Sequence, residues 1–69
     1  MAPNLHQLKS TQTRSRLLDA AMQVLQTKGY GQLSIHEVAR VAQMTTGAVQ
    51  HHFGSKAALM MEVLAHLID

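Results

Sequence analysis

The chain has 69 residues, enough for one small domain but too few for a catalytic cleft of ordinary size. The formal net charge is +2, and the acids are unevenly distributed, because none precedes Asp19 and none lies between Glu37 and Glu62. These two acid-free stretches can each face a polyanion. The absence of cysteine excludes a disulfide framework and a thiolate zinc site, so the apolar core alone must hold the fold.

The sequence predicts a soluble protein that stays in the cytoplasm and binds no membrane. No apolar run approaches the roughly 20 residues of a membrane span. The first ten residues lack the cationic start and apolar centre of a signal peptide. A chain without cysteine also fits a reducing compartment.

The first predicted helix covers residues 11–28, and the ten residues before it, which show no sustained hydrophobic period, are expected to form a mobile arm. Gly29 ends this helix, because glycine takes the left-handed conformation at no steric cost. The ring of Tyr30 is expected to fill the adjacent corner of the core. Apolar residues recur at three- and four-residue steps along one face of the helix, namely Leu17, Leu18, Ala21, Val24 and Leu25.

The second helix has a well-marked start at Ser34. Ser34 and Glu37 have the S-x-x-E spacing of a capping box, in which each side chain bonds the backbone of the other residue. Leu33 and Val38 occupy the two positions of a hydrophobic staple around that box. The inward face is predicted to consist of Val38, Ala39 and Ala42.

Only three residues, Gln43, Met44 and Thr45, separate the second helix from the third, so they must form a tight turn. Thr45 can cap the third helix, which runs to about Phe53, a core residue, and ends at Gly54. This short helix is expected to present a polar face outward, made of Thr46, Gly47, Gln50 and His51.

The fourth predicted helix, capped by Ser55, is apolar at nearly every position from residue 57 to residue 68. Only Glu62 and His66 form a polar line, at the i,i+4 spacing. A helix wetted on one side does not have this pattern. We therefore expect a further domain or subunit to cover this helix in the intact protein, and the 69 residues alone to expose an apolar patch.

A helix, a three-residue turn and a short second helix are typical of helix-turn-helix proteins, but many three-helix bundles share this pattern. The residues are more specific. Residues 14–25 (RSRLLDAAMQVL), 28–30 (KGY), 34–42 and above all 45–59 (TTGAVQHHFGSKAAL) closely resemble the amino-terminal region of the TetR family of transcriptional regulators. The resemblance covers about fifty residues without a gap, and a colinear series of this kind is more specific than any single motif.

The resemblance implies an all-α fold: a homeodomain-like three-helix bundle over residues 11–56, with the helix-turn-helix motif at about residues 34–53, and the start of a fourth helix. It also implies a homodimeric repressor that reads a palindromic double-stranded DNA operator. Residues 55–69 would lead into an effector-binding and dimerisation domain that is absent here, and a small-molecule effector bound in that domain would release the repressor. The alternative is a helical protein-interaction module with an idle DNA face.

Two positions depart from the family pattern. The family usually has glycine where this chain has Gln43, which implies a left-handed conformation that is costly for glutamine. The family commonly has a tyrosine on the phosphate backbone where this chain has Gln50. A glutamine cannot stack, but it can bond adenine N6 and N7 if it faces base edges.

Several candidate residues have a structural alternative. Thr45 can cap its helix and also contact phosphate, and Ile35 can belong to the core. Lys56, whose charge opposes the dipole of the fourth helix, fits a phosphate contact or plain solvation. Arg14 is either a solvated charge or a phosphate contact. Together with the family comparison, these arguments give the candidate DNA-binding set Arg14, Ile35, His36, Thr45, Thr46, Gly47, Ala48, Gln50, His51, His52 and Lys56.

No metal, cofactor or enzymatic activity is expected. His51 and His52, with His36 or His66 as a third ligand, suit one ion poorly, because adjacent helical residues point about 100° apart. The sequence also has no paired carboxylates, no serine with a plausible base and no glycine-rich phosphate loop.

Overall fold

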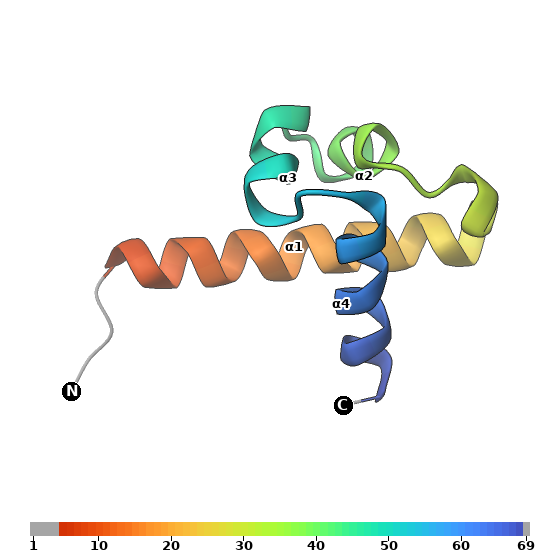
Figure 1. Cartoon of the computed structure of the whole chain (residues 1–69). Coiled ribbons are helices and arrows are strands. Elements are labelled where there is room, and N and C mark those ends of the chain that lie inside the picture. The colour runs from red at the N-terminus through yellow and green to blue at the C-terminus, as the bar shows by residue number, and fades with distance from the viewer. Residues whose placement is uncertain (1–4, 69) are drawn as a thin grey trace.

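The computed structural model describes residues 5–68, and their side chains from Thr11 onward. In Figure 1 the long first helix runs across the molecule, with two short helices beside it and the last helix running across it. The described part contains no strand, so the predicted all-α class is confirmed. The elements in chain order are α1 (Leu5–Lys28), the 3-10 turn η1 (Tyr30–Gln32), α2 (Ile35–Ala42), α3 (Thr46–His52) and α4 (Lys56–Ile68).

Helix α1 begins six residues earlier than the sequence predicted, at Leu5. The predicted start at residue 11 is therefore too late, while residues 1–4 of the expected arm lie outside the described part. Residues 5–10 contain neither glycine nor proline, so nothing ends the helix there. This end of α1 projects past the other helices (Figure 1), which explains why the sequence shows no hydrophobic period along it.

All four helices contribute to one apolar core. From α1, Leu17, Leu18, Ala21 and Val24 are buried as predicted, and Leu25 is half-buried against them. No described polar or charged side chain is buried, so the core carries no polar group that needs a partner. The remaining buried residues are Ala20, Leu33, Val38, Ala39, Ala42, Val49, Phe53, Leu59 and Val63.

Tyr30 does not fill the core, contrary to the sequence prediction. Its side chain is 57% exposed, and the corner is occupied by Leu33, which is 1% exposed. The 3-10 turn places Leu33, three residues later, on the inner side, and its N–H bonds the Tyr30 carbonyl oxygen at 3.0 Å. A phenol prefers a site where its hydroxyl stays wet, whereas leucine gains most from full burial.

Gly29 ends α1 as predicted, but in a different conformation. Its φ is 86° and its ψ is 172°, so the residue lies in a region of backbone space that is essentially restricted to glycine, rather than in the left-handed helical region. Its N–H bonds the carbonyl oxygens of Val24 and Leu25 at 3.2 and 3.0 Å, which satisfies part of the helix end.

Within the described residues, no helix combines the length and apolarity needed to span a bilayer.

Candidate nucleic-acid interface

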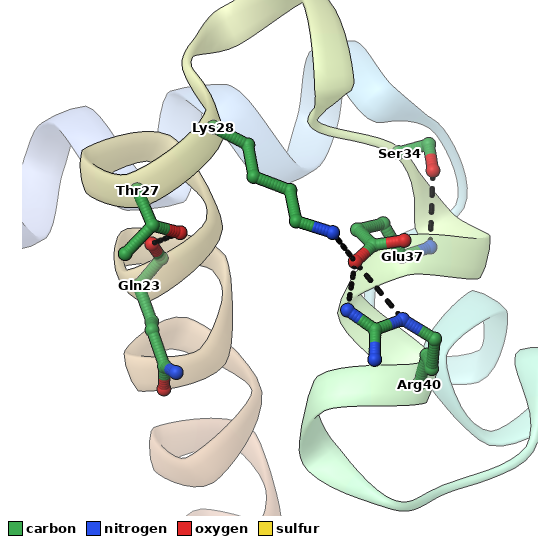
Figure 2. Close-up of polar contacts among 6 residues, drawn as sticks. All are labelled: Gln23, Thr27, Lys28, Ser34, Glu37 and Arg40. Carbon is green, nitrogen blue, oxygen red and sulfur yellow. Dashed lines mark hydrogen bonds and ion pairs between the residues drawn. The ribbon is translucent and has the colours of Figure 1, made fainter.

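The start of α2 is fixed by half of the predicted capping box. The Ser34 Oγ accepts a hydrogen bond from the Glu37 N–H at 3.0 Å. The Glu37 carboxylate does not return this contact. Its Oε1 instead accepts bonds from Lys28 Nζ at 2.9 Å and from Arg40 Nε at 3.0 Å, and Arg40 Nη2 also bonds it (Figure 2). The carboxylate therefore ties the end of α1 to α2.

These contacts change the ionisation of Glu37. Hydrogen bonds from Arg40 and then Lys28 favour the charged carboxylate and lower the pKa of Glu37 from 4.5 to about 2. The same carboxylate raises the pKa of Arg40. The only acid in α2 is thus paired with two cations beside it (Figure 2).

The turn between α2 and α3 depends on Gln43, whose φ of 59° and ψ of 46° confirm the predicted left-handed conformation. The Met44 N–H bonds the Ala39 carbonyl oxygen at 2.9 Å, and the Gln43 N–H bonds that of Arg40 at 3.2 Å. These two bonds form a Schellman motif, which normally carries glycine at this position. The motif satisfies the last carbonyls of α2 and sets the direction in which α3 leaves it.

Helix α3 is capped at its start and anchored on one side. The Thr45 Oγ1 accepts the Ala48 N–H at 3.1 Å, which confirms the predicted cap. Val49 is fully buried, and the Phe53 N–H closes the helix on the Val49 carbonyl oxygen at 2.8 Å. Val49 and Phe53 therefore pack one side of α3 on the core, and the opposite side faces solvent.

The outer side of α3 is polar and carries no acid. Thr45, Gly47, Gln50 and His51 are exposed, while Thr46, Ala48 and His52 are half-buried. The predicted outward residues are thus outward, with Thr46 partly covered. The imidazoles of His51 and His52 meet edge to face, with ring centroids 5.5 Å apart. Among the described residues, no three histidine, cysteine or acidic side chains lie close enough to hold a metal ion.

The remaining candidates lie around α3. In the first turn of α2, His36 is exposed, while Ile35 is half-buried and packs on the core. Lys56 stands at the start of α4 with its Nζ 4.1 Å from the centre of the Tyr30 ring and 3.3 Å from the Tyr30 carbonyl oxygen. Lys56 therefore contacts a residue distant in the sequence, which the argument from the helix dipole missed.

Arginine contacts were the other feature that sequence reasoning missed. Arg14 Nη2 lies 2.6 Å from Glu62 Oε2, and the Arg16 Nη2 donates to the Ala42 carbonyl oxygen at 3.3 Å. Both pairs join residues far apart in the sequence, so no local spacing announces them. The Glu37–Arg40 pair, at the i,i+3 spacing, could have been found.

The capped α2, the Schellman turn and the anchored α3 define a helix-turn-helix domain, the class that places its second helix in the DNA major groove. Comparison with known proteins agrees. The family model described as bacterial regulatory proteins of the tetR family matches residues 17–63. The chain therefore belongs to the tetR family and is the DNA-binding domain of a transcriptional regulator.

Curated relatives match most of this chain. It is 37% identical over 57 residues to the HTH-type transcriptional regulator SrpR of Pseudomonas putida, covering 83% of this chain and 27% of SrpR. It is 36% identical over 58 residues to the A-factor receptor protein of Streptomyces griseus, covering 84% and 21%. For the HTH-type transcriptional regulator AcrR of Shigella flexneri, the identity is 33% over 55 residues, covering 80% and 26%. The chain thus spans about a quarter of these relatives, and no solved structure matches it.

Proposed function

We propose that this chain reads a palindromic DNA operator by laying α3 in the major groove, two copies binding the two half-sites. The observation that carries the proposal is the outer side of α3. It is polar, contains no acid, and faces solvent because buried Val49 and Phe53 pack the opposite side on the core. Phosphate oxygens repel carboxylates and accept hydrogen bonds from hydroxyls, amides and imidazoles. Half-sites lie about 34 Å apart on one face of the duplex.

Within this surface, different side chains have different tasks. Thr46 and Gln50 contact base edges, and Ala48 offers a methyl to thymine where Gly47 lets the backbone approach closely. Thr45 and Lys56 contact phosphate from the starts of α3 and α4. Three histidines and a half-buried isoleucine complete the contact surface, namely Ile35, His36, His51 and His52.

The complete regulator is a cytoplasmic repressor with no enzymatic activity, and a small effector releases it from DNA. Two observations support a further domain after α4. The relatives are about three times as long as this chain, and α4 exposes a row of apolar side chains that water does not favour. The most exposed of these are Met61 (72%) and Ile68 (88%), with Leu64 and Leu67 about half exposed.

The proposal is tested by selecting duplexes from a random-sequence pool with the unaltered 69-residue chain and, separately, with the full-length regulator. We expect a palindrome from the regulator and its half-site from the chain, which binds weakly because no second copy is aligned with it. Affinity should fall steeply with salt, with a logarithmic slope near −0.9 for each phosphate neutralised. If the 69-residue chain selects no preferred sequence, or the full-length regulator selects none, the proposal is contradicted.

Gln50 gives a sharper test of base reading. Replacing Gln50 by tyrosine removes the side chain able to bond adenine N6 and N7, so we expect the selected duplexes to lose an A·T preference at one position. Because Gln50 is exposed, stability should be unchanged. The measurement is a second selection with the variant, and identical pools from the two proteins contradict the assignment.

The exposed apolar side of α4 favours one competing function, a module that docks a partner protein while α3 is idle. That function predicts no salt-dependent affinity of the full-length protein for any duplex. It also predicts that Leu64→Lys abolishes partner binding without changing the fold. Salt-dependent duplex binding by the full-length protein rejects it.

A further inference from the structure

Helices α3 and α4 rest on different parts of the fold. α3 packs mainly on α2, whereas α4 packs on α1. Residues 53–55 form the only covalent link between the two helices. A side chain that reaches both helices can therefore carry a further influence of α4 on α3.

Arg14, on α1, is such a side chain. Its Nη2 lies 2.6 Å from the Glu62 Oε2 in the middle of α4. Its Cζ lies 5.1 Å from the centre of the Phe53 ring. Phe53 ends α3, is 1% exposed and bonds the Val49 carbonyl oxygen through its N–H at 2.8 Å. One guanidinium thus touches α4 on one side and the closing residue of α3 on the other.

We propose that Arg14 is a positioning residue for DNA recognition: the Glu62 carboxylate holds its guanidinium over Phe53 and so fixes the carboxyl-terminal end of α3. This inference rests on the proposed function, because it concerns how α3 meets DNA. His51 and His52 lie at that end of α3 and move with it. Arg14 then acts through Phe53 instead of touching phosphate itself.

The exposure of the pair indicates a role in geometry more than in folding. The two side chains are 41% and 42% exposed, and ion pairs this open to water add little to stability. A guanidinium over an aromatic ring is attracted to the ring face, and the carboxylate limits the other orientations that a long side chain can take. Without the Glu62 carboxylate the guanidinium is free to leave the Phe53 ring, and the end of α3 loses that contact.

The proposal predicts a result opposite in sign to simple electrostatics. Glu62→Gln removes a negative charge, which by itself strengthens binding to a polyanion. Loss of the positioning contact should instead weaken binding of the 69-residue chain to a duplex it has selected from a random pool, by about three- to ten-fold. Asp19→Asn is the matched control, because exposed Asp19 makes no ion pair with the described side chains. It should bind as tightly as the unaltered chain or more tightly.

A charge exchange separates positioning from direct contact. Arg14→Glu and Glu62→Arg should each weaken binding, and the double variant should bind more tightly than the sum of the two changes predicts. If Arg14 contacts phosphate, its replacement instead reduces the salt slope by about one and the double variant shows no rescue. That second pattern overturns the proposal.

Amide chemical shifts of the free protein give a readout that does not depend on DNA. In Glu62→Gln the amides of His51, His52 and Phe53 should shift, while the melting temperature stays close to that of the unaltered chain. Shifts confined to α1 and α4, or a duplex affinity equal to that of the unaltered chain, overturn the inference. Failure of the unaltered chain to select any duplex contradicts the proposed function instead.

Discussion

The α2–α3 pair and α4 both bury apolar side chains against α1, yet their outer surfaces differ. Around α2 and α3, Ser34 and Thr45 cap the helix starts and the turn at Gln43 satisfies the end of α2. The outer side is polar. Helix α4 buries Leu59 and Val63 but leaves Met61 and Ile68 in water. The α2–α3 half thus has satisfied helix ends and a polar outer side, whereas α4 leaves apolar side chains in water, where the proposed further domain would cover them.

Truncating Phe53, which lies between α3 and the loop to α4, should have the largest effect on stability. Phe53→Ala deletes a fully buried ring beneath α3 and next to the loop to α4, and buried Phe→Ala changes cost about 3–5 kcal/mol. A domain of this size has little stability to spare, so we expect it to unfold at ambient temperature. Chemical denaturation monitored by circular dichroism measures this. Phe53→Leu is the control and should lose much less; equal losses contradict the assignment of the ring to the core.

The next effect concerns the backbone at the end of α1. Gly29→Asn should lower the free energy of unfolding by about 1–3 kcal/mol, because only glycine adopts the φ and ψ of this residue without strain. Nothing lies within 4 Å of a Cβ at Gly29, so the cost is purely conformational. Gly31→Ala is the matched control, since Gly31 has equal space and no positive φ. Thermal denaturation should separate the two variants, and similar melting temperatures count against strain at Gly29.

Relief of strain in the turn should stabilise the α2–α3 half. Gln43→Gly should raise the free energy of unfolding by up to about 1 kcal/mol, because glycine takes the left-handed conformation without a steric penalty. For a domain of this size the melting temperature then rises by roughly 4–8 °C per kcal/mol. Gln43→Ala keeps the strain and should show no rise. A lower or unchanged melting temperature for the glycine variant rejects the idea.

The smallest effect is a pH dependence at the start of α2. The pKa of Glu37 is lowered from 4.5 to about 2 in the folded chain, so the folded state favours the charged carboxylate. Its contribution to stability is fully present above pH 4.5 and is lost as the pH falls toward 2. Melting temperatures of the unaltered chain and of Glu37→Gln should therefore converge between pH 4.5 and 2. A constant difference over that interval contradicts the pairing with Arg40 and Lys28.

Local features of this fold could be predicted because local spacing determines them. The caps at Ser34, Thr45 and Ser55 were confirmed, as was the left-handed turn at Gln43. Each depends on residues within five positions of one another. The early start of α1 was missed for a related reason, since a helix that projects from the core needs no hydrophobic period.

Features set by the packing of distant elements could not be predicted. Leu33 is buried in place of the predicted Tyr30 because of a single 3-10 turn, and no local motif reveals the direction of that turn. The Arg14–Glu62 pair joins α1 to α4 only after α4 has folded across α1. In the candidate interface, sequence patterns identified the outward residues of α3, but not the cations already engaged by Glu37, Glu62 and Tyr30.

The position of Tyr30 also equips the chain with an internal optical probe. It is the only tyrosine, and there is no tryptophan, so the intrinsic fluorescence of the chain comes from one ring. That ring is open to water and has the Lys56 ammonium 4.1 Å from its centre. A phosphate that draws Lys56 away changes the surroundings of the fluorophore. If Lys56 contacts a phosphate as proposed, emission from this single ring should report that contact without any added label.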